Sequence, residues 1–130
     1  IPVMGHIGLL PQSAKNFRVK GKNSIEQGKI FKDAMSISKS GVFAIIIECV
    51  VEALAKSITS KVSIPTIGIG ASKFCDGQIL VAEDMLGLGD FSAKFVKQYV
   101  NLNKIMEKSI KRYAKDVKMR RFPYLKNTYK

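Results

Sequence analysis

Four short apolar segments, separated by stretches of helical or loop character, constrain the fold of this chain more than any other feature. They are rich in Val and Ile and cover residues 2–7, 42–50, 65–69 and 78–82. Segments of nearly continuous hydrophobicity are typical of strands buried on both faces of a parallel sheet. Pro65 opens its segment instead of interrupting it, so a strand can begin there. The sequence therefore predicts four strands of one parallel sheet.

Helices are predicted between the first three strands. Ser24, with Gln27 three residues later, is typical of a helix N-terminus, and apolar residues at helical spacing continue to near Gly41. Residues 51–62 show the same spacing. The alternation predicts a right-handed parallel α/β arrangement, either a small open doubly wound sheet or half of a (β/α)8 barrel. The chain opens on its first strand without an initiator Met, which favours the half barrel and leads us to expect the missing part upstream.

The positive charge is concentrated towards the C-terminal end. The 130 residues carry 22 Lys and Arg against 10 Asp and Glu, a net charge of +12, of which residues 94–130 hold +10. Apolar residues recur every three or four positions from Phe95 to Val117, which predicts an amphipathic helix. We expect three parts: a half-barrel core at 1–93, a basic amphipathic helix packing on the barrel at 94–123, and a tail at 124–130.

The alternative for this basic segment is a surface for nucleic acid or for an acidic membrane, since clustered cations with interleaved tyrosines also attract phosphates. Such binding would fall steeply with salt and would be lost with residues 94–130. A helix packed on a domain with its basic face in solvent is the favoured interpretation, so we do not expect nucleic acid as a partner.

Neither a membrane span nor a disulfide framework is indicated. Charge or turn residues interrupt every apolar stretch before the roughly 18–20 residues that a membrane helix needs, and no leader-like pattern stands at the front. We expect a cytoplasmic protein without a membrane partner. Cys49 and Cys75 lack disulfide or zinc spacing, so we interpret both as reduced structural thiols.

Two residues near predicted strand ends could carry chemistry. His6, the single histidine, lies between Gly5 and Gly8, and Glu48 ends a strongly apolar run. Side chains at the carboxyl ends of parallel strands line the ligand cleft of α/β folds. Burial raises the pKa of a carboxylate towards working pH, which suits a general base. The alternatives are a structural histidine and a capping or salt-bridged glutamate.

Two further motifs are less specific. Residues 68–72 contain two glycines but lack the third glycine of a dinucleotide fingerprint. Glu83 and Asp84 follow the fourth predicted strand and could bind a cation or cap the next helix, with capping favoured.

Four motifs taken together resemble ketopantoate hydroxymethyltransferases. They lie in the same order and at similar gaps, at residues 3–13, 47–50, 64–71 and 75–81. The resemblance implies strands five to eight, the C-terminal half, of a (β/α)8 barrel of the phosphoenolpyruvate and pyruvate superfamily. It also implies transfer of a hydroxymethyl group from 5,10-methylenetetrahydrofolate to 3-methyl-2-oxobutanoate, giving 2-dehydropantoate in pantothenate biosynthesis.

The same resemblance implies roles for the two strand-end residues. Glu48 matches the family's proton acceptor, and His6 matches a histidine that faces the bound keto acid. The Mg²⁺ ligands belong to the missing half, so no residue here is expected to bind metal, and the isolated half is expected to be inactive. The family also implies a homo-oligomer, a decamer.

Several departures from the family pattern leave rival interpretations open. The loop at 15–21 is shorter than usual, Ser72 replaces a glycine, and Glu83 stands where a histidine is common. Another keto-acid lyase or mutase of the same superfamily and a degraded remnant are the alternatives within this fold.

Overall fold

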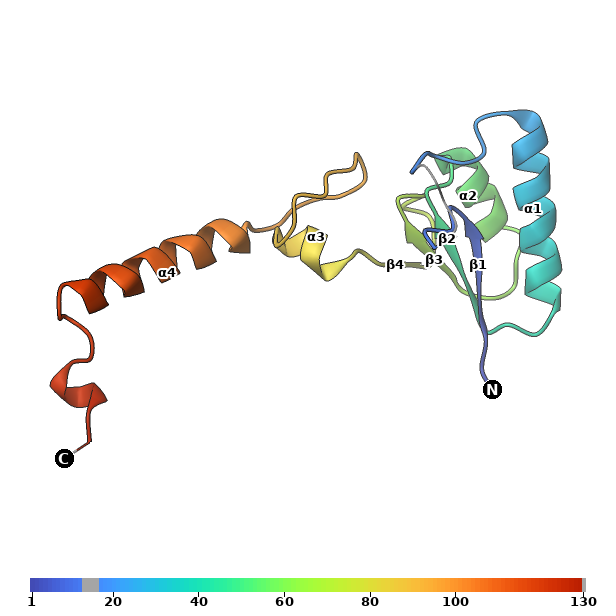
Figure 1. Ribbon diagram of the computed structural model, residues 1–130. Helices are drawn as coiled ribbons and strands as arrows, with labels where there is room; N and C mark the ends of the chain where they lie inside the picture. The colour runs from blue at the N-terminus through green and yellow to red at the C-terminus, as the bar shows by residue number, and fades with distance from the viewer. Residues whose placement is uncertain (13–16, 130) are drawn as a thin grey trace. The chain divides into compact units, whose positions relative to one another are not determined.

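The computed structural model describes residues 1–12 and 17–129, which form two compact units, Ile1–Leu80 and Val81–Lys130 (Figure 1). The first unit contains β1 (Met4–Gly8), α1 (Ser24–Lys39), β2 (Ala44–Glu48), α2 (Glu52–Thr59), β3 (Thr66–Ile69) and β4 (Gly77–Gln78). The second contains α3 (Ala82–Leu86), α4 (Leu102–Lys118) and the 3-10 helix η1 (Leu125–Asn127). None of the helices in the described ranges has the length and apolar content of a bilayer span.

The sheet of the first unit is parallel, and its strands lie in the order β1-β2-β3-β4. Each strand therefore pairs with the next one along the chain, with no reversal of order within the described residues. A doubly wound sheet reverses its order at a switch point, whereas a barrel adds its strands consecutively. The observed order confirms the predicted parallel α/β arrangement and is consistent with part of a barrel.

The hydrophobic core lies between one face of the sheet and the helices α1 and α2, which also contact each other. Ile45 and Ile47 of β2 point into this core and are fully buried, and Ile7 of β1 joins them. Burial of each such isoleucine contributes roughly 2 to 3 kcal/mol of hydrophobic stabilisation. Because strand side chains alternate, His6 and Glu48 lie on the opposite face of the sheet.

Helix α1 begins where the sequence predicts, but its cap uses different residues. Asn23 is the N-cap, and its Oδ1 accepts a hydrogen bond from the Glu26 amide at 2.8 Å. Glu26 in turn accepts from the amide of Gly21 at 2.7 Å. The capping pair therefore lies one residue earlier than the predicted Ser24 and Gln27.

The prediction of a strand at 78–82 was wrong in its extent. β4 consists of Gly77–Gln78, and Val81 already serves as the N-cap of α3. Ile79 and Val81 are about half exposed, so these apolar residues mark neither a buried strand nor a core position.

The terminal helix also begins later than its apolar pattern suggests. It starts at Leu102 because the Asn101 side chain accepts the Lys104 amide at 2.9 Å, whereas the amide of Tyr99 bonds to the Met85 carbonyl. Phe95 and Tyr99 therefore precede the helix. The packing of residues 94–123 on the barrel stays a prediction.

Asp76 accepts hydrogen bonds from Thr66, the first residue of β3. These bonds make the stability of the folded protein depend on pH. Asp76 Oδ2 accepts from the Thr66 amide at 2.8 Å and the Thr66 hydroxyl at 3.0 Å. These bonds stabilise the carboxylate and lower the pKa of Asp76. The stability that these bonds add is complete above the pKa of an aspartate in the unfolded chain, about 3.9. It is lost as pH falls through the lower pKa of Asp76 in the folded protein.

We therefore expect Asp76→Asn to reduce the free energy of unfolding more at pH 7 than below pH 3. Urea denaturation of both proteins at the two pH values measures this difference. The effect should shrink in a Thr66→Val background, which lacks the hydroxyl donor. An equal loss at both pH values would show that the carboxylate charge does not contribute.

Candidate active site

The sheet brings the two sequence-predicted site residues together. His6 pairs in register with Ile46, and Gly8 pairs with Glu48, so His6 and Glu48 are diagonal neighbours on one face of adjacent strands. His6 Nε2 lies 3.2 Å from Glu48 Oε2. The two side chains are 27% and 13% exposed, so the carboxylate is the more deeply buried partner.

The distance between His6 Nε2 and Glu48 Oε2 is that of an ion pair, but the two groups do not have the geometry of a hydrogen bond. Among the described residues, His6 Nε2 is buried and has no hydrogen-bond partner. A buried polar atom left unsatisfied costs about 1 to 3 kcal/mol. Nε2 therefore faces the Glu48 carboxylate without the geometry of a hydrogen bond.

Gly8 allows β1 to approach the backbone of Glu48. It has φ +94, and a Cβ at this position would lie 2.2 Å from the Glu48 carbonyl oxygen. That oxygen accepts a hydrogen bond from the Leu9 amide at 2.9 Å. A residue with a side chain would be strained in this conformation and would also clash with the backbone of the candidate base.

The chain after Glu48 is held by main-chain hydrogen bonds to the loop that follows β1. The Cys49 carbonyl accepts from the Lys20 amide at 2.7 Å, and the Lys20 carbonyl accepts from Val51 at 3.0 Å. Cys49 has φ +50, which is unusual for a residue with a side chain. Such strained positions persist where the surrounding structure holds them in place, and they cluster at functional sites.

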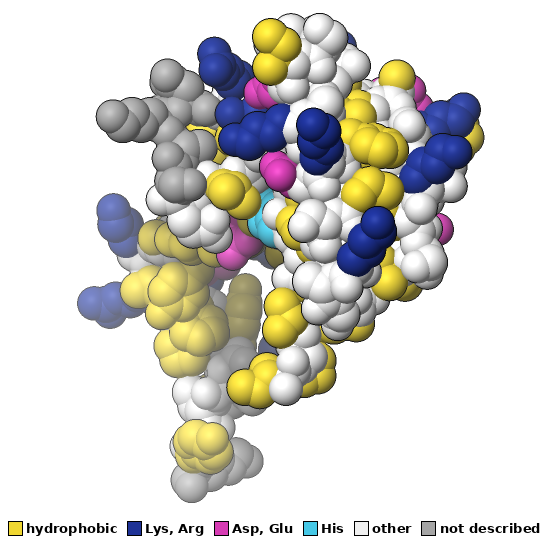
Figure 2. Space-filling model, turned by 90° about the vertical axis from the view of Figure 1, so that its right-hand side faces the viewer, with side chains coloured by type: hydrophobic (Ala, Val, Ile, Leu, Met, Phe, Trp, Pro, Cys, Tyr) yellow, Lys and Arg dark blue, Asp and Glu magenta, His cyan; other side chains and the backbone are white. Residues whose placement is uncertain are grey.

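A cavity of about 370 Å³ lies on the β1 side of this pair. Its lining includes His6, Gly8, Lys20, Lys29 and Asp33. Figure 2 shows histidine and acidic side chains next to one another on this face, with lysine and arginine side chains around them. His6 therefore borders this cavity, whereas Glu48 is not part of its lining.

Both cysteines are free and buried, as predicted. Burial, and then the charge of Glu48, raise the pKa of the Cys49 thiol. Because the thiolate is the reactive form, Cys49 is a poor nucleophile near neutral pH. No group of three His, Cys, Asp or Glu residues within the described ranges could hold a metal ion.

The acidic pair Glu83 and Asp84 and the residue Ser72 lie away from the His6–Glu48 pair in the sequence, and each has a local structural environment. Glu83 and Asp84 lie in the first turn of α3, where no side chain caps the helix, so the predicted capping was wrong. Because Val81 is the N-cap, both carboxylates fall inside the helix. Ser72 is buried, and its hydroxyl donates to Glu52 Oε1 at 3.2 Å, which ties the segment after β3 to α2.

Comparison with known proteins decides the family. A family model described as ketopantoate hydroxymethyltransferase matches residues 1–124. The chain belongs to this family. The match includes both strands of the His6–Glu48 pair, β1 and β2, and the whole parallel sheet.

Curated relatives of the ketopantoate hydroxymethyltransferase family are identical to the chain at about half of the matched positions. A 3-methyl-2-oxobutanoate hydroxymethyltransferase of Pelagibacter ubique is 50% identical over 129 residues, which is 99% of this chain and 50% of the relative. Proteins of the same name from Clostridium beijerinckii and Bartonella quintana are 52% and 53% identical, and the matches cover 100% of this chain and 49% and 48% of those proteins. The chain spans about half the length of the curated relatives it matches.

Proposed function

We propose that this chain provides the general base for transfer of a hydroxymethyl group from 5,10-methylenetetrahydrofolate to 3-methyl-2-oxobutanoate, giving 2-dehydropantoate. The observation that carries the proposal is the 3.2 Å approach of His6 Nε2 to Glu48 Oε2 on adjacent strands. The pair occurs in a chain of the ketopantoate hydroxymethyltransferase family, whose relatives carry this activity in their names. It places a base beside a group that can bind the substrate.

The fold that we propose for the working enzyme is a (β/α)8 barrel in which this chain supplies strands five to eight. Three observations support this. The four strands follow one another in order, α1 and α2 pack together on one face, and the curated relatives are about twice as long. The face that carries His6 and Glu48 would then line the barrel interior at the carboxyl ends of the strands, where barrel enzymes place their active sites.

In this mechanism Glu48 removes the proton from C3 of the keto acid, next to the ketone. The electron pair of the C–H bond forms the enolate, and the enolate carbon bonds to the methylene carbon as one of its two bonds to folate nitrogen breaks. Water then supplies the hydroxyl group as the second carbon–nitrogen bond breaks, which releases 2-dehydropantoate and tetrahydrofolate. We assign His6 to binding an oxygen of the keto acid, because it lies next to Glu48 and lines the cavity beside β1. A hydrogen bond to an oxygen that gains charge in the transition state lowers the barrier.

Further parts of the proposal concern groups outside the described residues. Mg²⁺ would bind to carboxylates in the half that completes the barrel, where it would hold the keto acid. A homo-oligomer, a decamer by family resemblance, and a cytoplasmic location belong to the same proposal.

Product analysis tests the reaction class. This chain would be joined to the part of the Pelagibacter ubique relative that it does not match, and incubated with 3-methyl-2-oxobutanoate. We expect 2-dehydropantoate in the presence of 5,10-methylenetetrahydrofolate and none without it. Conversion of the keto acid without the folate would instead identify a lyase or mutase of the same superfamily.

A further inference from the structure

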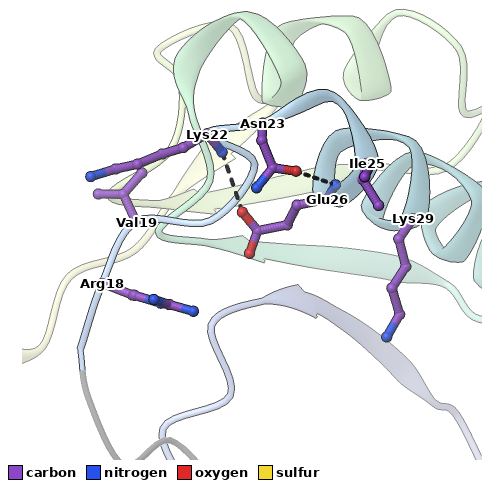
Figure 3. Close-up of a pocket in the computed structure, with 7 residues that line it drawn as sticks. All are labelled: Arg18, Val19, Lys22, Asn23, Ile25, Glu26 and Lys29. Carbon is purple, nitrogen blue, oxygen red and sulfur yellow. Dashed lines mark hydrogen bonds between the residues drawn. The ribbon is translucent and has the colours of Figure 1, made fainter.

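A basic cavity lies at the start of α1, outside the pair described above. It has a volume of about 600 Å³ and is lined by Arg18, Val19, Lys22, Asn23, Ile25, Glu26 and Lys29. Figure 3 shows the Arg18 and Lys29 side chains extending into the same space, with the carboxylate of Glu26 between them. The loop before α1 and the first turns of the helix thus bring cations to one place.

The cations of this cavity lack acidic partners. No ion pair engages Arg18, Lys22 or Lys29 in residues 1–12 and 17–129. Glu26 does not neutralise them closely, because its Oε2 accepts hydrogen bonds from the backbone amides of Gly21 and Lys22, at 2.7 and 3.3 Å. Arg18 and Lys29 therefore bring two cations to this space against one carboxylate, whereas the Lys22 side chain extends away from it (Figure 3). The cavity suits an anionic group that can receive charge-assisted hydrogen bonds.

The cavity adjoins the one that His6 lines. Glu26 and Lys29 line both, and the second cavity is also lined by His6. A molecule bound against His6 can thus extend past Lys29 towards Arg18. The ligand that fits this geometry is long, reactive at one end and anionic at the other.

We propose that the cavity at Arg18 and Lys29 binds the glutamate tail of the folate co-substrate. The inference rests on the proposed function, which brings a reduced folate to Glu48. A folate carries its reactive methylene group on the pteridine side, and its other end bears one or more glutamates whose carboxylates are ionised at neutral pH. The basic cavity binds these carboxylates while the methylene carbon lies at the neighbouring site.

The first test uses the full chain and tri-γ-glutamate, which lacks the pteridine. Arg18→Gln/Lys29→Gln should weaken its binding, measured by calorimetry, by at least about tenfold, because two charge-assisted contacts are lost. Lys32→Gln/Lys39→Gln removes the same charge from the same helix outside the cavity and should leave the affinity unchanged. Lys104→Gln/Lys108→Gln removes the same charge from the basic helix α4 and should also leave the affinity unchanged.

The second test measures KM in the chimera described above, with the 5,10-methylene forms of tetrahydropteroyl triglutamate and of tetrahydropteroate, which has no glutamate. In the chimera, Arg18→Gln/Lys29→Gln should raise KM for the triglutamate donor and leave KM for the donor without glutamate unchanged. The proposal that this cavity binds the glutamate tail would be overturned by equal KM values for the two donors in the unmodified chimera. Binding of tri-γ-glutamate that depends on Lys104 and Lys108 would also overturn it. Product from neither donor, with tri-γ-glutamate binding still dependent on Arg18 and Lys29, would refute the proposed function while supporting a polycarboxylate site.

Discussion

Glu48→Gln is expected to abolish exchange of the C3 proton of 3-methyl-2-oxobutanoate in the chimera. Glutamine is close in size to glutamate and can keep the contact with His6, but it cannot accept the proton. Removal of a positioned general base typically costs about 10² to 10⁴ in rate. The loss should appear in the exchange reaction itself, which requires no folate.

Incubation in deuterated water, followed by NMR of the C3 position, measures this exchange directly. Glu52→Gln is the matched control, because Glu52 begins α2 four residues after Glu48 and binds Ser72 instead of His6. We expect the control variant to exchange at the wild-type rate. Exchange at the wild-type rate in Glu48→Gln would remove Glu48 from the role of base.

Gly8→Ala is expected to destabilise the protein by about 2 to 5 kcal/mol, from the left-handed backbone conformation and a steric clash. The added Cβ would lie 2.2 Å from the Glu48 carbonyl oxygen and 2.7 Å from a Val50 methyl group, so the end of β2 must move. Because Glu48 moves with it, proton exchange should also fall. A displacement of about 1 Å can cost as much as 10²-fold in rate.

Gly28→Ala provides the control for this substitution. Gly28 lies inside α1, and a Cβ there meets no atom within 4 Å. Alanine should stabilise the helix by about 0.5 to 1 kcal/mol. Urea denaturation of both variants measures the two opposite effects. Similar stabilities for Gly8→Ala and Gly28→Ala would show that the backbone at Gly8 relaxes without cost.

Segments with a deeply buried face were the ones that sequence reasoning located well. Ala44–Glu48 falls inside the predicted 42–50 because Ile45 and Ile47 are in the core. The extent of β4 could not be found in this way, since Ile79 and Val81 are apolar but half exposed. The start of α4 depends on a side-chain cap at Asn101, which overrides the apolar periodicity that begins at Phe95.

The pairing of His6 with Glu48 required information that one strand alone does not contain. Each residue stands out by its type and position, but their contact depends on the register that sets Gly8 opposite Glu48. Nothing in the local pattern distinguishes this register from one shifted by two residues, which would keep the same faces buried. The positive φ of Cys49 is equally invisible in the sequence, because it follows from hydrogen bonds to Lys20 and Ile69.

The main-chain bonds around Glu48 also bear on how this site can diverge. The bonds from Leu9 to Glu48, from Lys20 to Cys49 and from Val51 to Lys20 use backbone atoms alone. Every amino acid except proline can donate such bonds. The loop can therefore accumulate side-chain changes over evolutionary time while the carboxylate keeps its place, and new specificity can arise in the loop without loss of the base.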